Sequence, residues 1–86
     1  MWEIKLHKQV LNFLKQHKEK DFLKRVDSAF EKLSQNPYHP ELDIKKLVGS
    51  EDDYRLRIGK YRFIYTVLED KILIYIYKAG NRGDIY

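Results

Sequence analysis

YRLRIGKYRFIY, residues 54–65, is the segment that decides the fold. Aromatic and aliphatic side chains recur at every second position, with arginines between them, which is the period of a strand that buries one face. Gly59-Lys60 interrupts the pattern, and glycine at the first position of a two-residue connection is typical of a tight β-hairpin. With this turn, Arg57 lies directly opposite Arg62. The segment therefore predicts an antiparallel hairpin with one apolar and one basic face.

The strand pattern continues beyond the hairpin. Residues 61–68 form one strand, a polar break follows at Glu69-Asp70, and residues 71–78 are rich in isoleucine and tyrosine. Such short connections make the three strands antiparallel neighbours. Alternation assigns one face to the core, with Tyr54, Leu56, Ile58, Tyr61, Phe63, Tyr65, Val67, Ile72, Ile74 and Ile76. It assigns the other face to Arg55, Arg57, Arg62, Ile64, Thr66, Leu73, Tyr75 and Tyr77.

The N-terminal half reads as a short strand and a helical hairpin. Residues 2–6 alternate like a half-buried strand, residues 7–17 have helical spacing, and residues 22–33 carry a clear apolar helical stripe. Asn36-Pro37 ends the second helix, and residues 38–53 are expected to be irregular. A helical hairpin must bury its stripe on one sheet face. We therefore predict an α+β fold of order β-α-α-β-β-β, with the N-terminal strand and helices on one face of an antiparallel sheet.

Length and composition narrow the class of protein. A chain of 86 residues suits one domain, 1–86. It has no cysteine, which excludes disulfides and fits a reducing compartment. No signal peptide and no apolar run of membrane-spanning length is visible, so we expect a cytoplasmic protein without a membrane partner. The three histidines lack metal-ligand spacing, and we expect no metal and no cofactor.

The positive charge concentrates at the C-terminal end. The net charge is +4, and from Tyr54 onward seven Lys/Arg stand against three Asp/Glu. Like charges directly opposite each other destabilise a sheet, so the pairing of Arg57 with Arg62 indicates a use for both. No carboxylate is expected on this face of the three strands. Arginines beside tyrosines suit phosphates and exposed bases, although a merely solvated strand face is the alternative.

Several spaced motifs in this region resemble the RelE/ParE family of bacterial toxins. They are Lys46-Leu47-Val48-Gly49, the segment 54–65 with its Tyr-Arg-x-Arg strand and Gly-x-Tyr-Arg turn, and the closing Gly80-Asn81-Arg82-Gly83-Asp84-Ile85-Tyr86. The resemblance implies the same β-α-α-sheet plan and a toxin of a type II toxin–antitoxin system. Its partner would be a cognate antitoxin protein.

The resemblance also implies an activity. RelE-like members cleave mRNA in the ribosomal A site, whereas ParE-like members inhibit DNA gyrase. Arg55, Arg57, Arg62, Arg82 and Tyr86 fall where RelE-like nucleases place basic and tyrosine residues, which favours a metal-independent endoribonuclease, an mRNA interferase. Attack by an RNA 2′-hydroxyl on the adjacent phosphorus would be the reaction. A gyrase inhibitor and a non-catalytic RNA- or partner-binding module stay open as alternatives.

This interpretation assigns roles to individual residues. The expected catalytic residues are Arg57, Arg62, Arg82 and Tyr86, and the expected RNA-binding residues are Arg55, Tyr75, Tyr77 and Lys60. Some relatives have lysines where this chain has Arg55 and Arg57. Since arginine does not deprotonate, the general base must be another group, and Tyr86 is the candidate.

Overall fold

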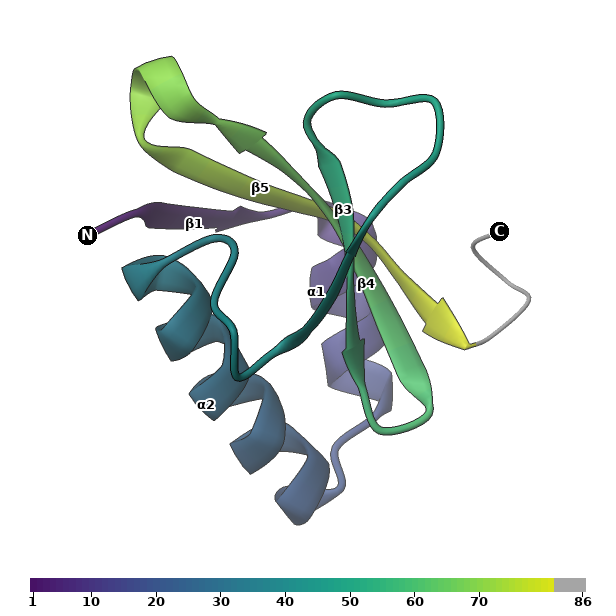
Figure 1. Ribbon diagram of the computed structural model, residues 1–86. Helices are drawn as coiled ribbons and strands as arrows, with labels where there is room; N and C mark the ends of the chain where they lie inside the picture. Colours follow the sequence, from purple (N-terminus) through teal and green to yellow (C-terminus); the bar gives the residue numbers. More distant parts are fainter. Residues whose placement is uncertain (82–86) are drawn as a thin grey trace.

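The computed structural model describes residues 1–81 (Figure 1). The chain begins with one strand and two helices, and then forms the other strands in succession. In chain order the elements are β1 (Glu3–Leu6), α1 (Lys8–Gln16), α2 (Lys20–Gln35), β2 (Asp43–Lys46), β3 (Asp53–Ile58), β4 (Tyr61–Leu68), the short 3₁₀ helix η1 (Glu69–Lys71) and β5 (Leu73–Asn81).

All five strands form one sheet in the order β1-β5-β4-β3-β2. The β3–β4 hairpin has the predicted register, with Arg57 opposite Arg62 and Ile58 opposite Tyr61. The α+β class is confirmed, but the sheet is mixed, because β1 runs parallel to β5. Alternation reveals which side of a strand is buried but not its direction, and β1 is far in sequence from its neighbour β5, with no short turn between them to fix that direction. The fully antiparallel sheet was therefore a wrong prediction.

β2 is a strand that the sequence did not predict. Asp43–Lys46 pairs antiparallel with β3, although this stretch was expected to be irregular. Three of its four residues are charged, and only Ile44 contributes to the core. A short, charged segment is typical of a sheet edge and carries almost no periodic signal. Its position matters because it borders the open face beside β3.

A β-bulge in β5 changes which residues lie on which face. Ile64 pairs with Lys78, but the next residue, Tyr65, pairs with Ile76, so Tyr77 is an extra residue between them. Beyond the bulge the alternation is inverted. Ala79 consequently lies in the core, and Lys78 lies on the open face.

One further face assignment needs correction, and one open-face residue is buried. Ile72, predicted in the core, precedes β5 and is 55% exposed, with a left-handed backbone at φ 50° where η1 ends. Ile64 lies in register with the open-face residue Arg55, as predicted, but is only 3% exposed. The open face therefore has a buried apolar centre.

Both helices pack on the same face of the sheet (Figure 1). α1 contributes Val10 and Phe13, whose ring meets the rings of Tyr61 and Phe63 edge-on. α2 contributes Val26, Ala29 and Leu33 to the same cluster. With one face buried in this way, the other face of the sheet remains open.

Within residues 1–81, neither helix is long and apolar enough to cross a membrane.

Candidate nucleic-acid interface

Five cationic side chains gather on the sheet face opposite the helices, and we call this surface the arginine face. It consists of Lys45, Arg55, Arg57, Arg62 and Lys78. One cross-strand row runs Lys45, Arg55, Ile64, Lys78, and the next runs Asp43, Arg57, Arg62, Gly80. Because residues opposite each other share a face, four strands present this charge on one surface.

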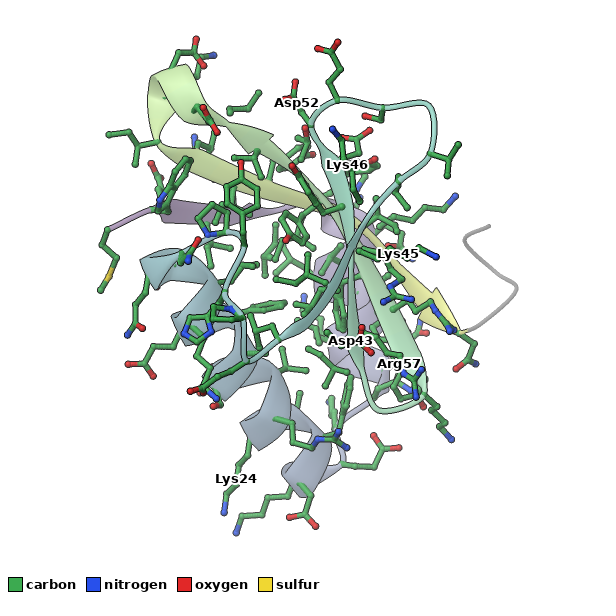
Figure 2. The ribbon with its side chains drawn as sticks, in the orientation of Figure 1. Lys24, Asp43, Lys45, Lys46, Asp52 and Arg57 are labelled. Atoms are coloured by element: carbon green, nitrogen blue, oxygen red, sulfur yellow. The ribbon has the colours of Figure 1, made fainter. Side chains whose placement is uncertain are left out.

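Asp43 is the carboxylate that partly balances this charge. Its Oδ1 atom lies 2.7 Å from Nη2 of Arg55, and its Oδ2 atom lies 3.8 Å from Nε of Arg57. Figure 2 shows Asp43 and Arg57 close together near the β3–β4 turn, with Lys45 further along β2. The prediction that this face lacks carboxylates was wrong, because Asp43 comes from the unforeseen β2 and Asp53 opens β3 one residue earlier than expected.

The arginines differ in how freely they can move. The side chain of Arg55 is only 14% exposed and is held by Asp43, whereas that of Arg57 is 52% exposed. Nε of Arg57 also donates a hydrogen bond to the carbonyl oxygen of Gly59 at 3.3 Å. Arg55 is thus a fixed positive charge, and Arg57 is an accessible guanidinium tethered to the turn.

A surface pocket of about 400 Å³ adjoins these arginines. Its lining combines cations with apolar side chains of the β2–β3 loop, namely Lys45, Lys46, Leu47, Val48, Arg55 and Arg62. Val48 is fully exposed. Apolar side chains beside guanidinium groups suit a nucleotide, whose base is apolar on its faces and whose phosphate is anionic.

Tyr75 and Tyr77 form an aromatic patch on the same sheet face. Tyr75 lies opposite Thr66, and its ring centroid is 6.2 Å from that of Tyr77. Burial, together with the charge of Asp53 and a hydrogen bond to it, raises the pKa of the Tyr77 phenol. Tyr77 therefore stays protonated at neutral pH and can stack or donate, but cannot act as a base there.

Comparison with known proteins fits this geometry. The family model for the ParE toxin of the type II toxin–antitoxin system parDE matches residues 4–86. The RelE1 protein of Methanocaldococcus jannaschii is 41% identical over 86 residues, covering 99% of this chain and 94% of that protein. The chain belongs to the RelE/ParE family of type II toxins.

Two further relatives of this RelE/ParE protein are informative. A chain of the archaeal RelE–RelB complex from Pyrococcus horikoshii is 35% identical, with 96% of this chain and 97% of that chain covered and a TM-score of 0.83. The mRNA interferase toxin RelE of Escherichia coli is 33% identical over 45 residues, which is 50% of this chain and 47% of that protein. The fold is thus shared over 96% of this chain, and the similarity to the mRNA interferase covers half of the chain.

The structure of this family member brings together most, but not all, of the predicted residues. Arg55, Arg57 and Arg62 lie on one surface, with Tyr75 and Tyr77 along it. Lys60 does not join them, because its ammonium lies 5.4 Å from the centroid of the Tyr61 ring. That ring belongs to the core under the helices.

Other residues lie outside the prediction or outside the described chain. Arg82 and Tyr86 follow residue 81 and are not among the described residues. Lys45 and Lys78 were missed, the first because β2 was not foreseen and the second because of the bulge. The alternation of the apolar Ile44 with the charged Lys45 was the available sequence signal for a strand here. Among residues 1–81, no group of three His, Cys, Asp or Glu residues could hold a metal ion.

Proposed function

We propose that this RelE/ParE toxin is a metal-independent endoribonuclease that cleaves mRNA on the ribosome and so inhibits translation. The observation that carries the proposal is the direct pairing of Arg57 with Arg62, with Arg55 in the next row of the same face. Such a like-charge pair is unfavourable in an empty sheet, and a polyanion on the face offsets the repulsion. Half of the chain is similar to an mRNA interferase, which supports RNA as that polyanion.

The proposed reaction is an internal phosphoryl transfer. The 2′-oxygen of one nucleotide attacks the adjacent phosphorus, a 2′-O–P bond forms, and the bond from phosphorus to the 5′-oxygen of the next nucleotide breaks. The upstream fragment ends in a 2′,3′-cyclic phosphate and the downstream fragment in a 5′-hydroxyl. Arg57 and Arg62 would stabilise the charge that develops on the non-bridging oxygens, the largest contribution that such a site usually makes.

Proton transfer needs groups other than these arginines, which keep their protons at any accessible pH. Tyr77 is unsuitable as a base because burial and Asp53 raise its pKa. We therefore assign the removal of the 2′-hydroxyl proton to Tyr86, with Arg82 as a further guanidinium beside the phosphate. The 5′-oxygen takes its proton from water.

The remaining residues would hold the RNA. Arg55 is suited to grip a substrate phosphate, since it is fixed in place by Asp43. Tyr75 and Tyr77 offer stacking surfaces for unpaired bases, and such stacking is worth about 1–3 kcal/mol per base. The pocket lined by Arg55 and Arg62 would receive a nucleotide next to the scissile bond.

The proposal includes a protein partner and a compartment. A similar chain forms a RelE–RelB complex in Pyrococcus horikoshii, so we propose that a cognate antitoxin neutralises this toxin. An mRNA and ribosome target places the action in the cytoplasm.

Primer extension on mRNA in a purified translation system tests the function. The wild-type protein should produce discrete cuts that depend on ribosomes, and Arg62→Ala should abolish them while keeping its circular dichroism spectrum. Lys71→Ala removes a positive charge at the other end of the sheet and should cleave normally. A 3′-hydroxyl on the upstream fragment would exclude attack by the 2′-hydroxyl.

A supercoiling assay with DNA gyrase should run in parallel, because the matching family model describes ParE toxins. If the protein inhibits gyrase and does not cleave RNA, it is a gyrase inhibitor and not a nuclease. Ribosome binding without any cut product would instead indicate a non-catalytic RNA-binding module.

A further inference from the structure

A second group of cations surrounds the tip of the β3–β4 hairpin, on the side of α2. Arg25 of α2 reaches the turn, and a Cβ atom placed on Gly59 would lie 3.1 Å from its Nη1 and 3.7 Å from its Cζ. The guanidinium therefore rests against the glycine backbone, where any side chain would crowd it. Gly59 also has φ +61°, which glycine adopts without strain.

Arg57 is anchored to the same glycine. Its Nε atom donates to the carbonyl oxygen of Gly59 at 3.3 Å. Two guanidinium groups from different elements thus lie beside a single turn residue, Arg25 from the helix layer and Arg57 from the arginine face. The hydrogen bond of Arg57 restrains its side chain, which reduces the conformational freedom lost when it binds an anion.

Cations outnumber carboxylates around Arg25. Two surface pockets of about 420 and 400 Å³ flank it. The first is also lined by Lys24, Lys32 and Arg57 against Glu41 and Asp43, and the second by Lys60 against Glu19. Lys32 is neutralised by Glu41 at 3.2 Å. Within residues 1–81, no carboxylate lies within ion-pair distance of Lys24 or Arg25. Figure 2 shows Lys24 extending from α2 away from the body of the protein.

We infer that the β3–β4 turn is a second phosphate-binding site, at which Arg25 and Arg57 together hold a phosphodiester of the RNA chain. Arg57 lies at the border between the two surfaces, because it belongs to the arginine face by register and also lines the pocket beside α2. RNA that leaves the arginine face passes around the hairpin tip to α2. Lys24 and Lys60 would flank its path, which gives Lys60 a place away from the other predicted RNA contacts.

This inference rests on the proposed function, because it extends the RNA beyond the nucleotides that react. Bidentate donors such as guanidinium match the geometry of a phosphate, whereas a lysine offers only a point charge. The interaction is independent of sequence, as contacts to the backbone are. Arg25, which takes no part in the proposed reaction, would act on RNA affinity and leave the chemical step to Arg57 and Arg62.

Binding of 2′-O-methyl RNA, which cannot be cleaved, tests the site by fluorescence anisotropy over a series of salt concentrations. Arg25→Gln should weaken binding about three- to tenfold, as loss of one exposed charge-assisted contact implies. The slope of log affinity against log salt should fall by about 0.7, the value for one phosphate of a single strand. Arg25→Lys should restore the slope but only part of the affinity. Lys71→Ala, at the opposite end of the sheet, should change neither.

Cleavage kinetics separate this inference from the proposed function. If the site exists, Arg25→Gln should raise KM and leave kcat unchanged, and a trinucleotide should bind equally well to both proteins. If the wild-type protein cleaves RNA and Arg25→Gln keeps full affinity and slope, the second site is wrong and the nuclease stands. If the wild-type protein neither binds nor cleaves RNA, the proposed function fails. A variant that loses antitoxin affinity but not RNA affinity would assign Arg25 to a protein contact instead.

Discussion

Replacing Asp43 with asparagine should lower the stability of the protein and raise its affinity for RNA at the same time. The carboxylate bridges β2 to two arginines of β3, at 2.7 Å from Arg55 and 3.8 Å from Arg57. The same donors would bind phosphate in the proposed function. Asp43 therefore stabilises the free protein by occupying guanidinium groups that would otherwise bind the RNA phosphate. Its removal should change stability and RNA affinity in opposite directions.

The stability change should be small. The side chain of Asp43 is 54% exposed, so solvent screens the pair, and measured values for such pairs are about 0.2–1 kcal/mol. Asparagine keeps an oxygen that can accept from Arg55, which limits the loss further. For a chain of this size, up to about 1 kcal/mol lowers Tm by no more than roughly 4–8 °C. Thermal unfolding followed by circular dichroism measures it.

The affinity change has the opposite sign. A phosphate near Arg55 and Arg57 would lie a few ångströms from the carboxylate, and two like charges about 5 Å apart in water repel by roughly 0.8 kcal/mol. Removing this repulsion should tighten the binding of 2′-O-methyl RNA about fourfold, and somewhat more where the freed donors reach the phosphate.

The control for this prediction is Asp70→Asn, which changes the net charge equally on η1. It should alter RNA binding by less than a factor of two, since screening over a Debye length of about 8–10 Å removes most distant effects. If Asp43→Asn binds RNA no better than Asp70→Asn, the idea that the RNA phosphate binds these arginines is refuted. A variant more stable than the wild type would refute the ion-pair argument.

Three other predictions concern the fold around the site. Gln9 clamps the end of β5 by donating to the Ala79 carbonyl at 2.7 Å and accepting from the Ala79 amide at 2.8 Å, so Gln9→Ala should cost about 1–3 kcal/mol in urea unfolding, and Gln16→Ala almost nothing. The buried Tyr65 hydroxyl donates to the Pro37 carbonyl at 2.6 Å, so Tyr65→Phe should destabilise by about 1–3 kcal/mol; an unchanged Tm would mean that this carbonyl finds another donor. Burial raises the pKa of Tyr65, Tyr38 and Tyr77 above the ordinary 10.0, so their contribution to stability is complete below pH 10 and is lost as the pH rises above it. Urea midpoints measured on both sides of pH 10 should show this fall, which Tyr65→Phe should make shallower.

The hairpin could be predicted in detail because its signals are local. In residues 54–65 the alternation identifies the faces, and Gly59 identifies the turn, so the register follows from the residues themselves. The pairing of Arg57 with Arg62 was therefore available from sequence and is confirmed. The apolar stripe of α2 was available for the same reason, as Val26, Ala29 and Leu33 lie in the core.

What the sequence did not reveal depends on non-local pairing. β2 exists because Ile44 meets the core and β3 supplies hydrogen-bond partners, neither of which is visible in the letters DIKK. The bulge at Tyr77 shifts the register of β5 against β4 by one residue, and no local sequence pattern indicates it. As a result, the sequence did not place Asp43, Lys45 and Lys78 on this surface.

The like-charge pair and the fold coexist because they occupy opposite faces of the same two strands. Arg57 and Arg62 facing each other cost about 0.2–1 kcal/mol. Leu56 and Phe63, also directly opposite each other, are fully buried, and each such side chain contributes roughly 1.5–3 kcal/mol. The core side outweighs the repulsion several times, so the hairpin keeps its register even when the arginine face carries no ligand. It follows that the arginine face is preformed, and that, under the proposed function, substitutions on it should change RNA binding and cleavage far more than they change the stability of the fold.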